Sequence, residues 1–241
     1  MSKYLVRTLS VQTESNIESN VRSNVFWRAL KCFSPKRVKP HPSEIHVPSQ
    51  CATLSQAVHR ASANHKVHTI LIDTGFYSMQ VETIFINISN LTIKGAGIDS
   101  TQICGEGYHG KIQISPFCQN ITIEGLHLCC QGSGNGIEIM DKSSVLLNNV
   151  KISGGGVGVY ARKDSNVVIR DSVICGNACP GVYVEDAGTE CNIYDSSIVF
   201  NDSNGCYANR NGRIVLHSCL IEKNQDGDDE VQENGMIIRN I

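Results

Sequence analysis

The sequence predicts an all-β chain wound as a parallel β-helix. A phrase of glycine, an apolar residue, tyrosine and a second apolar residue begins at Gly158, Gly181 and Gly205, and a relative without tyrosine begins at Gly136. The steps are 22 residues (136 to 158), 23 (158 to 181) and 24 (181 to 205). Each step holds three short apolar runs and no helical pattern, which is typical of one coil of a β-helix.

Residues 1–44 differ in composition from the rest, because they are rich in Ser, Asn, Arg and Lys. Their apolar island, residues 25–33, predicts two turns of helix that end before Ser34 and Pro35. The only tryptophan, Trp27, lies in this island. We expect a partly disordered N-terminal arm whose short helix packs on the body of the protein.

A capping α-helix is expected at residues 52–61. Thr53 is a suitable N-cap. The apolar residues of this segment share one helical face: Leu54, Ala57, Val58 and Ala61. Such a helix covers the open end of a coil stack. Strands follow at residues 68–73 and 91–94, and the repeats run on from Leu91 without a linker, which favours one β-helix domain over residues 45–241.

Each repeat continues with a second apolar run, such as residues 166–169, and a third, such as residues 172–174. The third run closes on an asparagine in successive coils, at Asn177, Asn201 and Asn224. Neighbouring strands lie roughly 4.8 Å apart, so we expect these amides to hydrogen-bond along the stack as an Asn ladder. A turn-forming role explains each asparagine singly but not the spacing.

Side chains alternate between the two faces of a strand, which predicts an exposed row on the glycine-bearing strands. Four residues are expected to face outward: Glu138, Tyr160, Tyr183 and Tyr207. Stacked tyrosines offer a large contact area at low entropic cost, suited to sugar rings or a peptide. The alternative is an aromatic ladder that only stabilises the fold. We take this row, with Arg162 beside it, as the candidate binding site.

Charged residues follow the tyrosine-bearing strands, at Asp141, residues 162–164, Glu185, Asp186 and Arg210. Acid and base alternate from coil to coil, a pattern typical of mutual salt bridges on a solvent-exposed edge. Catalysis by Arg162, Asp164, Glu185 and Asp186 is the less favoured interpretation, because a lyase needs an acidic Ca²⁺ cluster beside a base and a hydrolase needs paired carboxylates. Histidines and cysteines show no metal-ligand spacing, so no metal or cofactor is expected.

The amino-acid composition indicates the cellular compartment and the kinds of partner to expect. A net charge of −2 and a pI near 6.4 give no general attraction to nucleic acid or to an anionic membrane. The first ten residues lack the apolar core of a secretory signal. The eleven cysteines are odd in number and several fall in strands, which favours a reduced, intracellular protein. A disulfide-stapled secreted protein is the alternative.

Two segments carry a resemblance to a known fold family. The order of the helix, residues 69–77 and residues 91–97 resembles the start of pectin-lyase-like right-handed β-helix proteins. The resemblance covers about residues 45–241 and implies a single-stranded right-handed parallel β-helix with an N-terminal capping α-helix. Because this fold hosts lyases, hydrolases, epimerases and non-catalytic proteins, it implies no single activity.

A narrower resemblance concerns the coil phrase together with residues 23–32. The coils are similar to the β-helix half of eukaryotic F-box proteins, and the segment around Trp27 looks like the tail of an F-box whose front half is missing here. The resemblance implies a non-catalytic, intracellular scaffold that recognises a protein substrate for a cullin-type ubiquitin ligase, with the arm contacting the cullin adaptor. The alternative function is a lyase or epimerase acting on acidic polysaccharide, and carbohydrate is the alternative ligand.

Residues 235–241 match the opening strand of another coil. An exposed strand edge is a row of unpaired backbone groups. We therefore expect this edge to be covered by a partner protein or by self-association.

Overall fold

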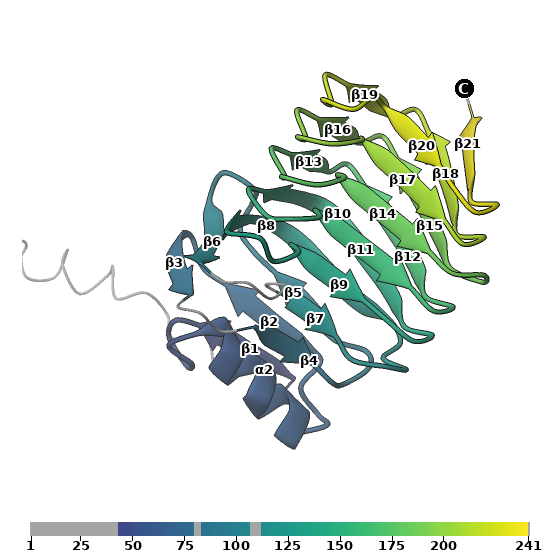
Figure 1. The fold of residues 1–241 in the computed structure, drawn as a ribbon. Coiled ribbons are helices and arrows are strands. Elements are labelled where there is room, and N and C mark those ends of the chain that lie inside the picture. Colours follow the sequence, from purple (N-terminus) through teal and green to yellow (C-terminus); the bar gives the residue numbers. More distant parts are fainter. Residues whose placement is uncertain (1–42, 80–82, 107–111, 241) are drawn as a thin grey trace, which may run out of the picture. The chain divides into compact units, whose positions relative to one another are not determined.

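The computed structural model describes residues 43–79, 83–106 and 112–240. Its strands lie in one compact unit, Pro40–Ile241, where the chain winds into stacked coils (Figure 1). Each pair of neighbouring strands is parallel, as predicted. The structure does not describe residues 1–42, so the predicted helix at 25–33 and Trp27 lie outside it.

Three columns of strands form the walls of the coils. The first column, in sheet A, contains β1 (Glu44–Val47), β2 (Thr69–Ile72), β5 (Thr92–Lys94), β8 (Ile121–Gln131), β10 (Ser144–Ser153), β12 (Asn166–Arg170), β15 (Glu190–Tyr194), β18 (Arg213–His217) and β21 (Met236–Asn240). The second column contains β3 (Gly75–Met79), β6 (Thr101–Glu106), the later halves of β8 and β10, β13 (Val173–Cys175), β16 (Ser197–Val199) and β19 (Leu220–Glu222). The third column is sheet B, with β4 (Ile84–Ile86), β7 (Ile112–Ile114), β9 (Ile137–Ile139), β11 (Val159–Arg162), β14 (Val182–Glu185), β17 (Cys206–Asn209) and β20 (Asp229–Val231).

The stack begins earlier than the visible repeat. β1 and β2 already pair in sheet A, and β4 already forms the first strand of sheet B, before the residue near Leu91 at which the sequence period becomes recognisable. Coils at this end have longer and less regular connections, which obscure the spacing in the sequence.

The corner between the first and second columns is a single left-handed residue in five successive coils, from β8 to β18. It is Gly125 and Asn149 within β8 and β10, and Asp171, Asp195 and Ser218 in the next coils, with φ between 47° and 63°. Glycine, asparagine and aspartate adopt this conformation at the lowest cost. Because one residue suffices, the second and third runs form one continuous strand in β8 and in β10, where the sequence suggested separate strands.

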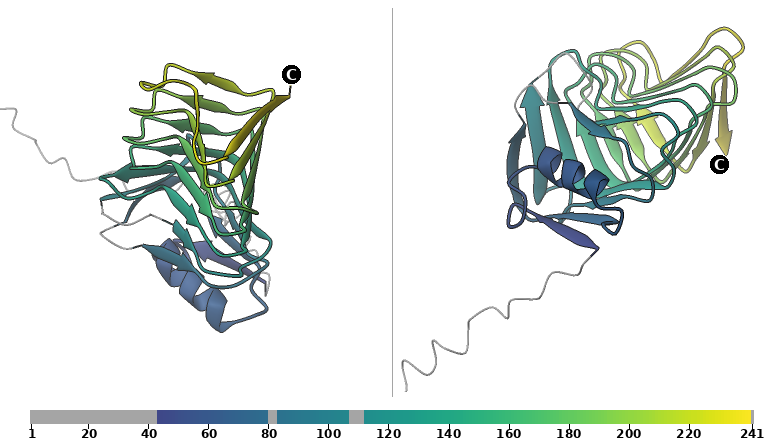
Figure 2. Two further views of the ribbon diagram at one scale, coloured as in Figure 1. Left: turned by 45° about the vertical axis from the view of Figure 1, so that its right-hand side comes forward. Right: turned by 90° about the horizontal axis from the view of Figure 1, so that it is seen from below.

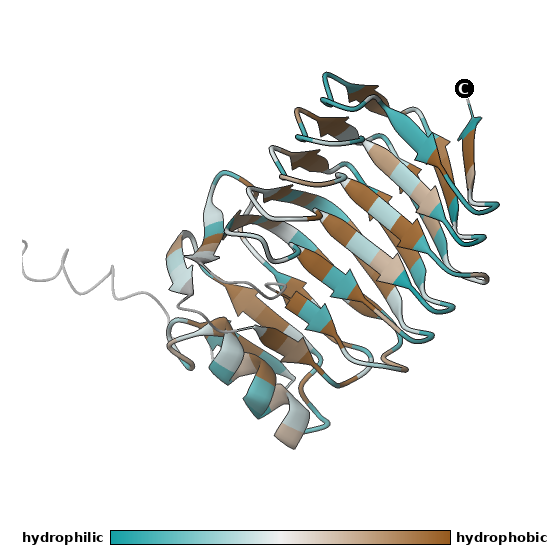
Figure 3. Cartoon of the chain, viewed as in Figure 1, coloured by the Kyte–Doolittle hydropathy of each residue, from teal (hydrophilic) through white to brown (hydrophobic). Residues whose placement is uncertain are grey.

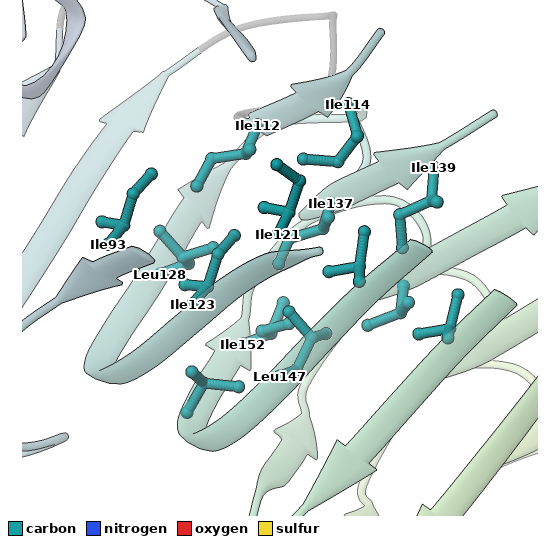
Figure 4. Close-up of a cluster of buried hydrophobic side chains, with 14 of the residues drawn as sticks. Ile93, Ile112, Ile114, Ile121, Ile123, Leu128, Ile137, Ile139, Leu147 and Ile152 are labelled. Carbon is teal, nitrogen blue, oxygen red and sulfur yellow. The ribbon is translucent and has the colours of Figure 1, made fainter. Parts of the chain in front are cut away.

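The core is a stack of thin aliphatic layers enclosed by the three walls. The labelled side chains in Figure 4 point into this space, among them Ile93, Ile121, Ile137 and Leu147, which are all at most 1 % exposed. Figure 3 shows apolar and polar bands alternating along the strands. Cys191 and Cys206 are fully buried, which confirms that these cysteines act as small hydrophobic residues.

The glycine of each repeat faces the Asn ladder. A Cβ atom on Gly181 would lie 2.5 Å from Ile198 Cγ2 and 2.8 Å from Asn201 Nδ2, and Gly158 and Gly205 have equivalent neighbours in their own coils. Any larger residue would push these packed groups apart. The glycine period therefore marks where sheet B passes closest to the turn that carries the asparagines.

The predicted Asn ladder is present. Asn177 Nδ2 donates to Asn201 Oδ1 at 2.9 Å, and Asn201 Nδ2 donates to Asn224 Oδ1 at 2.8 Å. The same oxygens accept the backbone N–H groups of Asn177 and Asn201, each at 3.1 Å. All three side chains are buried, so the ladder satisfies polar groups that water does not reach.

Helix α2 (Leu54–Ala63) covers the first coil, as predicted. The Thr53 side chain accepts a hydrogen bond from Gln56 N at 3.2 Å and so caps the helix. The predicted apolar face is buried, and α2 contacts β1, β2 and β4. The right-hand view of Figure 2 shows α2 lying across the end of the coils. Within the described ranges, no helix is long and apolar enough to span a bilayer.

Candidate functional site: the tyrosine face of sheet B

An outward row crosses sheet B at one position in each strand. The register places Glu138, Tyr160, Tyr183 and Tyr207 side by side on β9, β11, β14 and β17, with Glu230 next in line on β20. Their neighbours along each strand are buried, so the row faces outward as predicted. We call Tyr160, Tyr183 and Tyr207, with the flanking Glu138, Arg162, Glu185, Asn209 and Arg210, the tyrosine face.

The three tyrosine rings form a continuous stack. The Tyr160 and Tyr183 ring centroids are 5.0 Å apart with an interplanar angle of 29°, and those of Tyr183 and Tyr207 are 4.7 Å apart at 30°. All three side chains are half-buried. The middle ring, Tyr183, thus has a neighbour on each side, the outer two rings have one each, and all three keep part of their surface exposed.

Glu185 lies under this stack. Tyr160 Oη donates to Glu185 Oε1, and Tyr183 Oη donates to Glu185 Oε2 at 2.9 Å. Arg210 Nη1 lies 3.7 Å from the second oxygen, and Asn209 Nδ2 donates to Tyr183 Oη at 3.4 Å. The carboxylate therefore joins two tyrosines, an asparagine and an arginine from three neighbouring strands and the turn that follows β17.

Glu185 does not lie on a solvated edge, and that prediction from the sequence is wrong. Glu185 is only 7 % exposed, because β14 extends to it and the tyrosine rings cover it. The alternation of side chains along a strand could have indicated this position, because Glu185 follows Tyr183 by two residues and therefore lies on the same face of β14. Sequence reasoning also missed Asn209, which pairs with Glu185 in the register for the same reason.

The environment keeps the tyrosine protons in place. Burial raises the pKa of Tyr160, and its hydrogen bond to the Glu185 carboxylate raises the pKa further. Burial is also the main cause that raises the pKa of Tyr183 and of Tyr207. At neutral pH these hydroxyls are therefore protonated and act as hydrogen-bond donors.

Arg162 flanks the row, as predicted. Its Nη2 atom lies 3.1 Å from Glu138 Oε1, and its guanidinium lies 5.4 Å from the centroid of the Tyr160 ring. Its Nε atom is buried and lacks a hydrogen-bond partner within the part of the chain that the structure describes. Contacts with Glu138 and the Tyr160 ring thus hold the Arg162 guanidinium beside the row.

The turn after the row carries exposed ion pairs of the kind the sequence predicted. Lys163 Nζ lies 3.5 Å from Asp141 Oδ1, and Arg210 Nε lies 3.3 Å from Glu233 Oε2. Arg210 keeps 58 % of its side chain exposed, so its guanidinium is accessible to an anionic ligand. Over residues 43–79, 83–106 and 112–240, no group of three or more His, Cys, Asp or Glu side chains is arranged to hold a metal ion.

The family follows from a comparison with known proteins. The family model described as "Right handed beta helix region" matches residues 74–240, so the chain belongs to this family and its coils have the predicted right-handed sense. No curated protein matches the chain. The likeness to F-box proteins, and with it a role for Trp27, stays a prediction.

Solved structures share the fold at low identity. The mannuronan C-5 epimerase AlgE6 A-module of Azotobacter vinelandii has a TM-score of 0.51 at 12 % identity, with 76 % of this chain and 69 % of that chain covered. Pectate lyase Pel9A has a TM-score of 0.49 at 12 % identity, covering 69 % and 48 % of the two chains. The catalytic domain of a GH87 α-1,3-glucanase has a TM-score of 0.49 at 13 % identity, covering 77 % and 46 %. The match thus spans about half the length of the pectate lyase and the glucanase, and these likenesses concern the fold alone.

Proposed function

We propose that the chain binds an extended acidic polysaccharide along the tyrosine face and acts on it as a lyase or an epimerase. The observation that carries the proposal is the buried carboxylate of Glu185, held by the hydroxyls of two stacked tyrosines beside an exposed arginine. An aromatic ladder with only a structural role needs no carboxylate beneath it and no arginine at its rim.

The face suits a chain of uronic acids in two respects. The ring stack advances by one strand per tyrosine, and its partly open surface offers apolar area and polar edges to successive sugar rings. Arg162 and Arg210 supply positive charge along the edge of the stack where β11 and β17 end, and a guanidinium binds a carboxylate well through parallel hydrogen bonds. Two acidic residues, Glu138 and Glu230, lie at the two ends of the tyrosine row, beyond Tyr160 and Tyr207.

Both proposed reactions start with loss of the proton on C5 of a uronic acid. In the proposed step, a tyrosine oxygen takes the C5 proton while its own proton passes to Glu185, because the two groups are already hydrogen-bonded. The electron pair left on C5 is delocalised into the uronate carboxyl group, which Arg210 neutralises. In a lyase the C4=C5 double bond then forms as the C4–O bond breaks, and the leaving C4 oxygen takes the tyrosine proton while Glu185 returns its proton to the tyrosine. In an epimerase, water gives a proton to the opposite face of C5, and Glu185 later releases its proton to solvent.

The fold class supports the proposal without identifying the substrate. Proteins with this fold include one named as a mannuronan C-5 epimerase module and one named as a pectate lyase. Their similarity to this chain is too low to transfer a substrate, and the proposal for this chain rests on its own tyrosine face.

The test is turnover of defined polyuronates, with and without Ca²⁺, in deuterated water. Deuterium appearing at C5 detects an epimerase, and ultraviolet absorption of an unsaturated product detects a lyase, whose C4=C5 double bond leaves no hydrogen on C5. We expect Glu185→Gln to lower the rate by at least ~100-fold, because the tyrosine loses its proton acceptor. Glu222→Gln, a change of the same type at an exposed site on β19, is the matched control and is expected to leave the rate within about twofold.

Binding with neither deuterium at C5 nor unsaturated product would contradict the catalytic part and leave a non-catalytic carbohydrate-binding scaffold. The absence of binding, exchange and unsaturated product would reject the polysaccharide proposal. The predicted role in substrate recognition for a cullin-type ubiquitin ligase would then be the remaining candidate. It is tested separately by co-purification of a cullin adaptor with the full chain and loss of that adaptor in Trp27→Ala.

A further inference from the structure

Two cysteines lie directly beside each other on neighbouring coils, outside the tyrosine face. Cys104 on β6 is in register with Cys129 on β8. The same row continues to Ser78 on one side and to Ser153 and Cys175 on the other. Cys104 and Cys129 are therefore the adjacent cysteines of the row, whereas Ser153 separates Cys129 from Cys175.

The geometry of this pair suits a covalent link. In-register residues of neighbouring strands have Cα atoms roughly 4.8 Å apart, and disulfides join Cα atoms about 4.4 to 6.8 Å apart. The thiols of Cys104 and Cys129 are already hydrogen-bonded to each other. A bond requires the two Cβ atoms to approach by roughly 1 Å from the strand spacing, so the disulfide would be strained and easily reduced.

The two thiols differ in accessibility and acidity. Cys129 is half-exposed, whereas Cys104 is buried. Burial raises the pKa of the Cys104 thiol to about 12, and the hydrogen bond to Cys129 contributes to the rise. An external reagent therefore meets Cys129 first, and Cys104 reacts within the protein.

We propose that Cys104 and Cys129 are a redox modification site that forms a reversible disulfide between neighbouring coils by exchange with a small-molecule disulfide such as oxidised glutathione. In the first step the Cys129 thiolate attacks one sulfur of the reagent, forms a mixed disulfide and releases one glutathione thiolate. In the second step the Cys104 thiolate attacks Cys129 Sγ and releases the second glutathione. The two protons lost by the cysteines are taken up by the two glutathione thiolates, and the reagent is the oxidant.

The link would close the coil that contains β7. Strand β7 lies between Cys104 and Cys129 in the chain and pairs with β9, which carries Glu138 of the tyrosine face. A bond between β6 and β8 therefore restrains the coil adjacent to the proposed binding surface. Such a cross-link stabilises the fold chiefly by restricting the unfolded chain.

The experiment treats the full chain with oxidised glutathione, counts free thiols and maps cross-linked peptides after digestion without reduction. We expect the loss of two thiols, one peptide pair joining Cys104 to Cys129, a melting temperature raised by several degrees and full reversal by a reducing thiol. Cys104→Ser is expected to stop at a glutathione adduct on Cys129. Cys175→Ser, a change at the same row two coils away, is expected to form the Cys104–Cys129 link as the unaltered chain does.

The pH dependence separates the two steps. Because the pKa of Cys104 lies far above neutral, closure of the mixed disulfide is expected to speed up about tenfold per pH unit between pH 7 and 9. Ser153→Cys tests the strand register, because it places a new thiol in the row between Cys129 and Cys175. We expect this thiol to compete with Cys104 for a disulfide with Cys129. Circular dichroism before digestion shows that each variant is folded.

Three results would overturn the proposal. They are a stable glutathione adduct that never closes in the unaltered chain, a link between the sequence neighbours Cys129 and Cys130, and equal closure in Cys104→Ser. Each readout is covalent and independent of polysaccharide turnover, so it stands or falls separately from the proposed function.

Discussion

Glu185 is the residue on which the proposed chemistry depends. A carboxylate withdrawn from water is costly unless hydrogen bonds and a counter-charge compensate for the lost hydration. Here two tyrosine hydroxyls and the Arg210 guanidinium provide that compensation. The same contacts that stabilise the charge also place a proton acceptor next to two hydroxyls that face outward.

Removing the carboxylate is expected to destabilise the protein as well as inactivate it. Glu185→Ala leaves two half-buried hydroxyls without their acceptor, and we expect a loss of about 2 to 3 kcal/mol in the free energy of unfolding. Urea denaturation measures the change. Glu222→Ala removes a carboxylate that is 43 % exposed and is expected to change stability by less than about 0.5 kcal/mol. Equal effects of the two substitutions would contradict the contacts assigned to Glu185.

The raised tyrosine pKa values predict a distinct alkaline titration. Because the folded pKa of Tyr160 lies above the unfolded value of 10.0, the folded state favours the neutral phenol. The resulting stability is fully present below pH 10 and is lost as the pH rises through the folded pKa. When tyrosinate absorbance is followed as the pH rises, we expect some tyrosines to ionise well above pH 10. Tyr160→Phe should lower the number of these late-ionising tyrosines by one. Ionisation of all seven tyrosines in one step near pH 10 would count against this environment.

At the scale of elements, the repeat is held by contacts between equivalent turns. The Asn ladder satisfies buried backbone and side-chain groups along successive coils, and the repeat glycine leaves the space in which the ladder packs. The ladder and the glycines therefore act together, and neither tolerates a change of size or polarity.

The middle of the ladder is expected to be its most sensitive position. Asn201→Ala leaves donors and acceptors of Asn177 and Asn224 unpaired in a buried site, and we expect a loss of about 2 to 4 kcal/mol in stability. Asn166→Ala, on the exposed side of β12, is the matched control and is expected to cost about 0.5 kcal/mol or less. Thermal unfolding of both variants measures the difference, and a tolerated Asn201→Ala would refute the ladder's contribution.

The tight packing around the repeat glycine leads to a similar prediction about side-chain volume at this position. Gly181→Ala places a Cβ atom 2.5 Å from Ile198 Cγ2, so the packed layer must shift, and we expect a cost of about 1 to 3 kcal/mol. Gly176→Ala is not an equivalent control, because Gly176 has a φ of 61°. The suitable comparison is Ser197→Ala on the outer face of β16, which is expected to be nearly neutral. A stabilised Gly181→Ala would show that the layers are looser than the structure indicates.

Much of the fold was predictable because each structural role recurs once per coil. The period located the glycines, the ladder asparagines and the outward tyrosines, and Thr53 marked the start of the capping helix. The corner residues were not recognised, because Gly125, Asn149, Asp171 and Ser218 share a backbone conformation and not a chemical type. Alternation along β14 puts Glu185 on the face of Tyr183, but its burial was not predictable, because it depends also on the contact with Tyr160 of the neighbouring strand.

At the scale of the whole described unit, the coils stack from α2 to β21 by parallel pairing, so each coil depends mainly on its neighbours. Strands β21 and β20 are the last of sheets A and B in the part of the chain that the structure describes. Met236 and Val231 on these strands are 50 % and 49 % exposed. This surface is where the predicted self-association would take place.

Self-association through this surface is expected to depend on concentration. Combined Met236→Lys and Val231→Lys substitutions add charge to the exposed strands and should shift the chain towards monomer in sedimentation or light-scattering measurements. Phe200 is also apolar and 57 % exposed, but it follows β16, in an internal coil. Phe200→Lys should therefore leave the distribution between monomer and oligomer unchanged. A monomer at all concentrations would contradict self-association as the means of covering this edge.

Affinity for a defined oligouronate, measured by calorimetry for the unaltered chain, Tyr183→Ala and Tyr194→Ala, tests the central claim most directly. Tyr183 lies in the middle of the tyrosine face, whereas Tyr194 lies on sheet A, stacked on His217. We expect Tyr183→Ala to weaken binding by about tenfold or more and Tyr194→Ala to leave it unchanged. Equal affinity of all three proteins, or loss of binding only in Tyr194→Ala, would contradict the assignment of the site to sheet B.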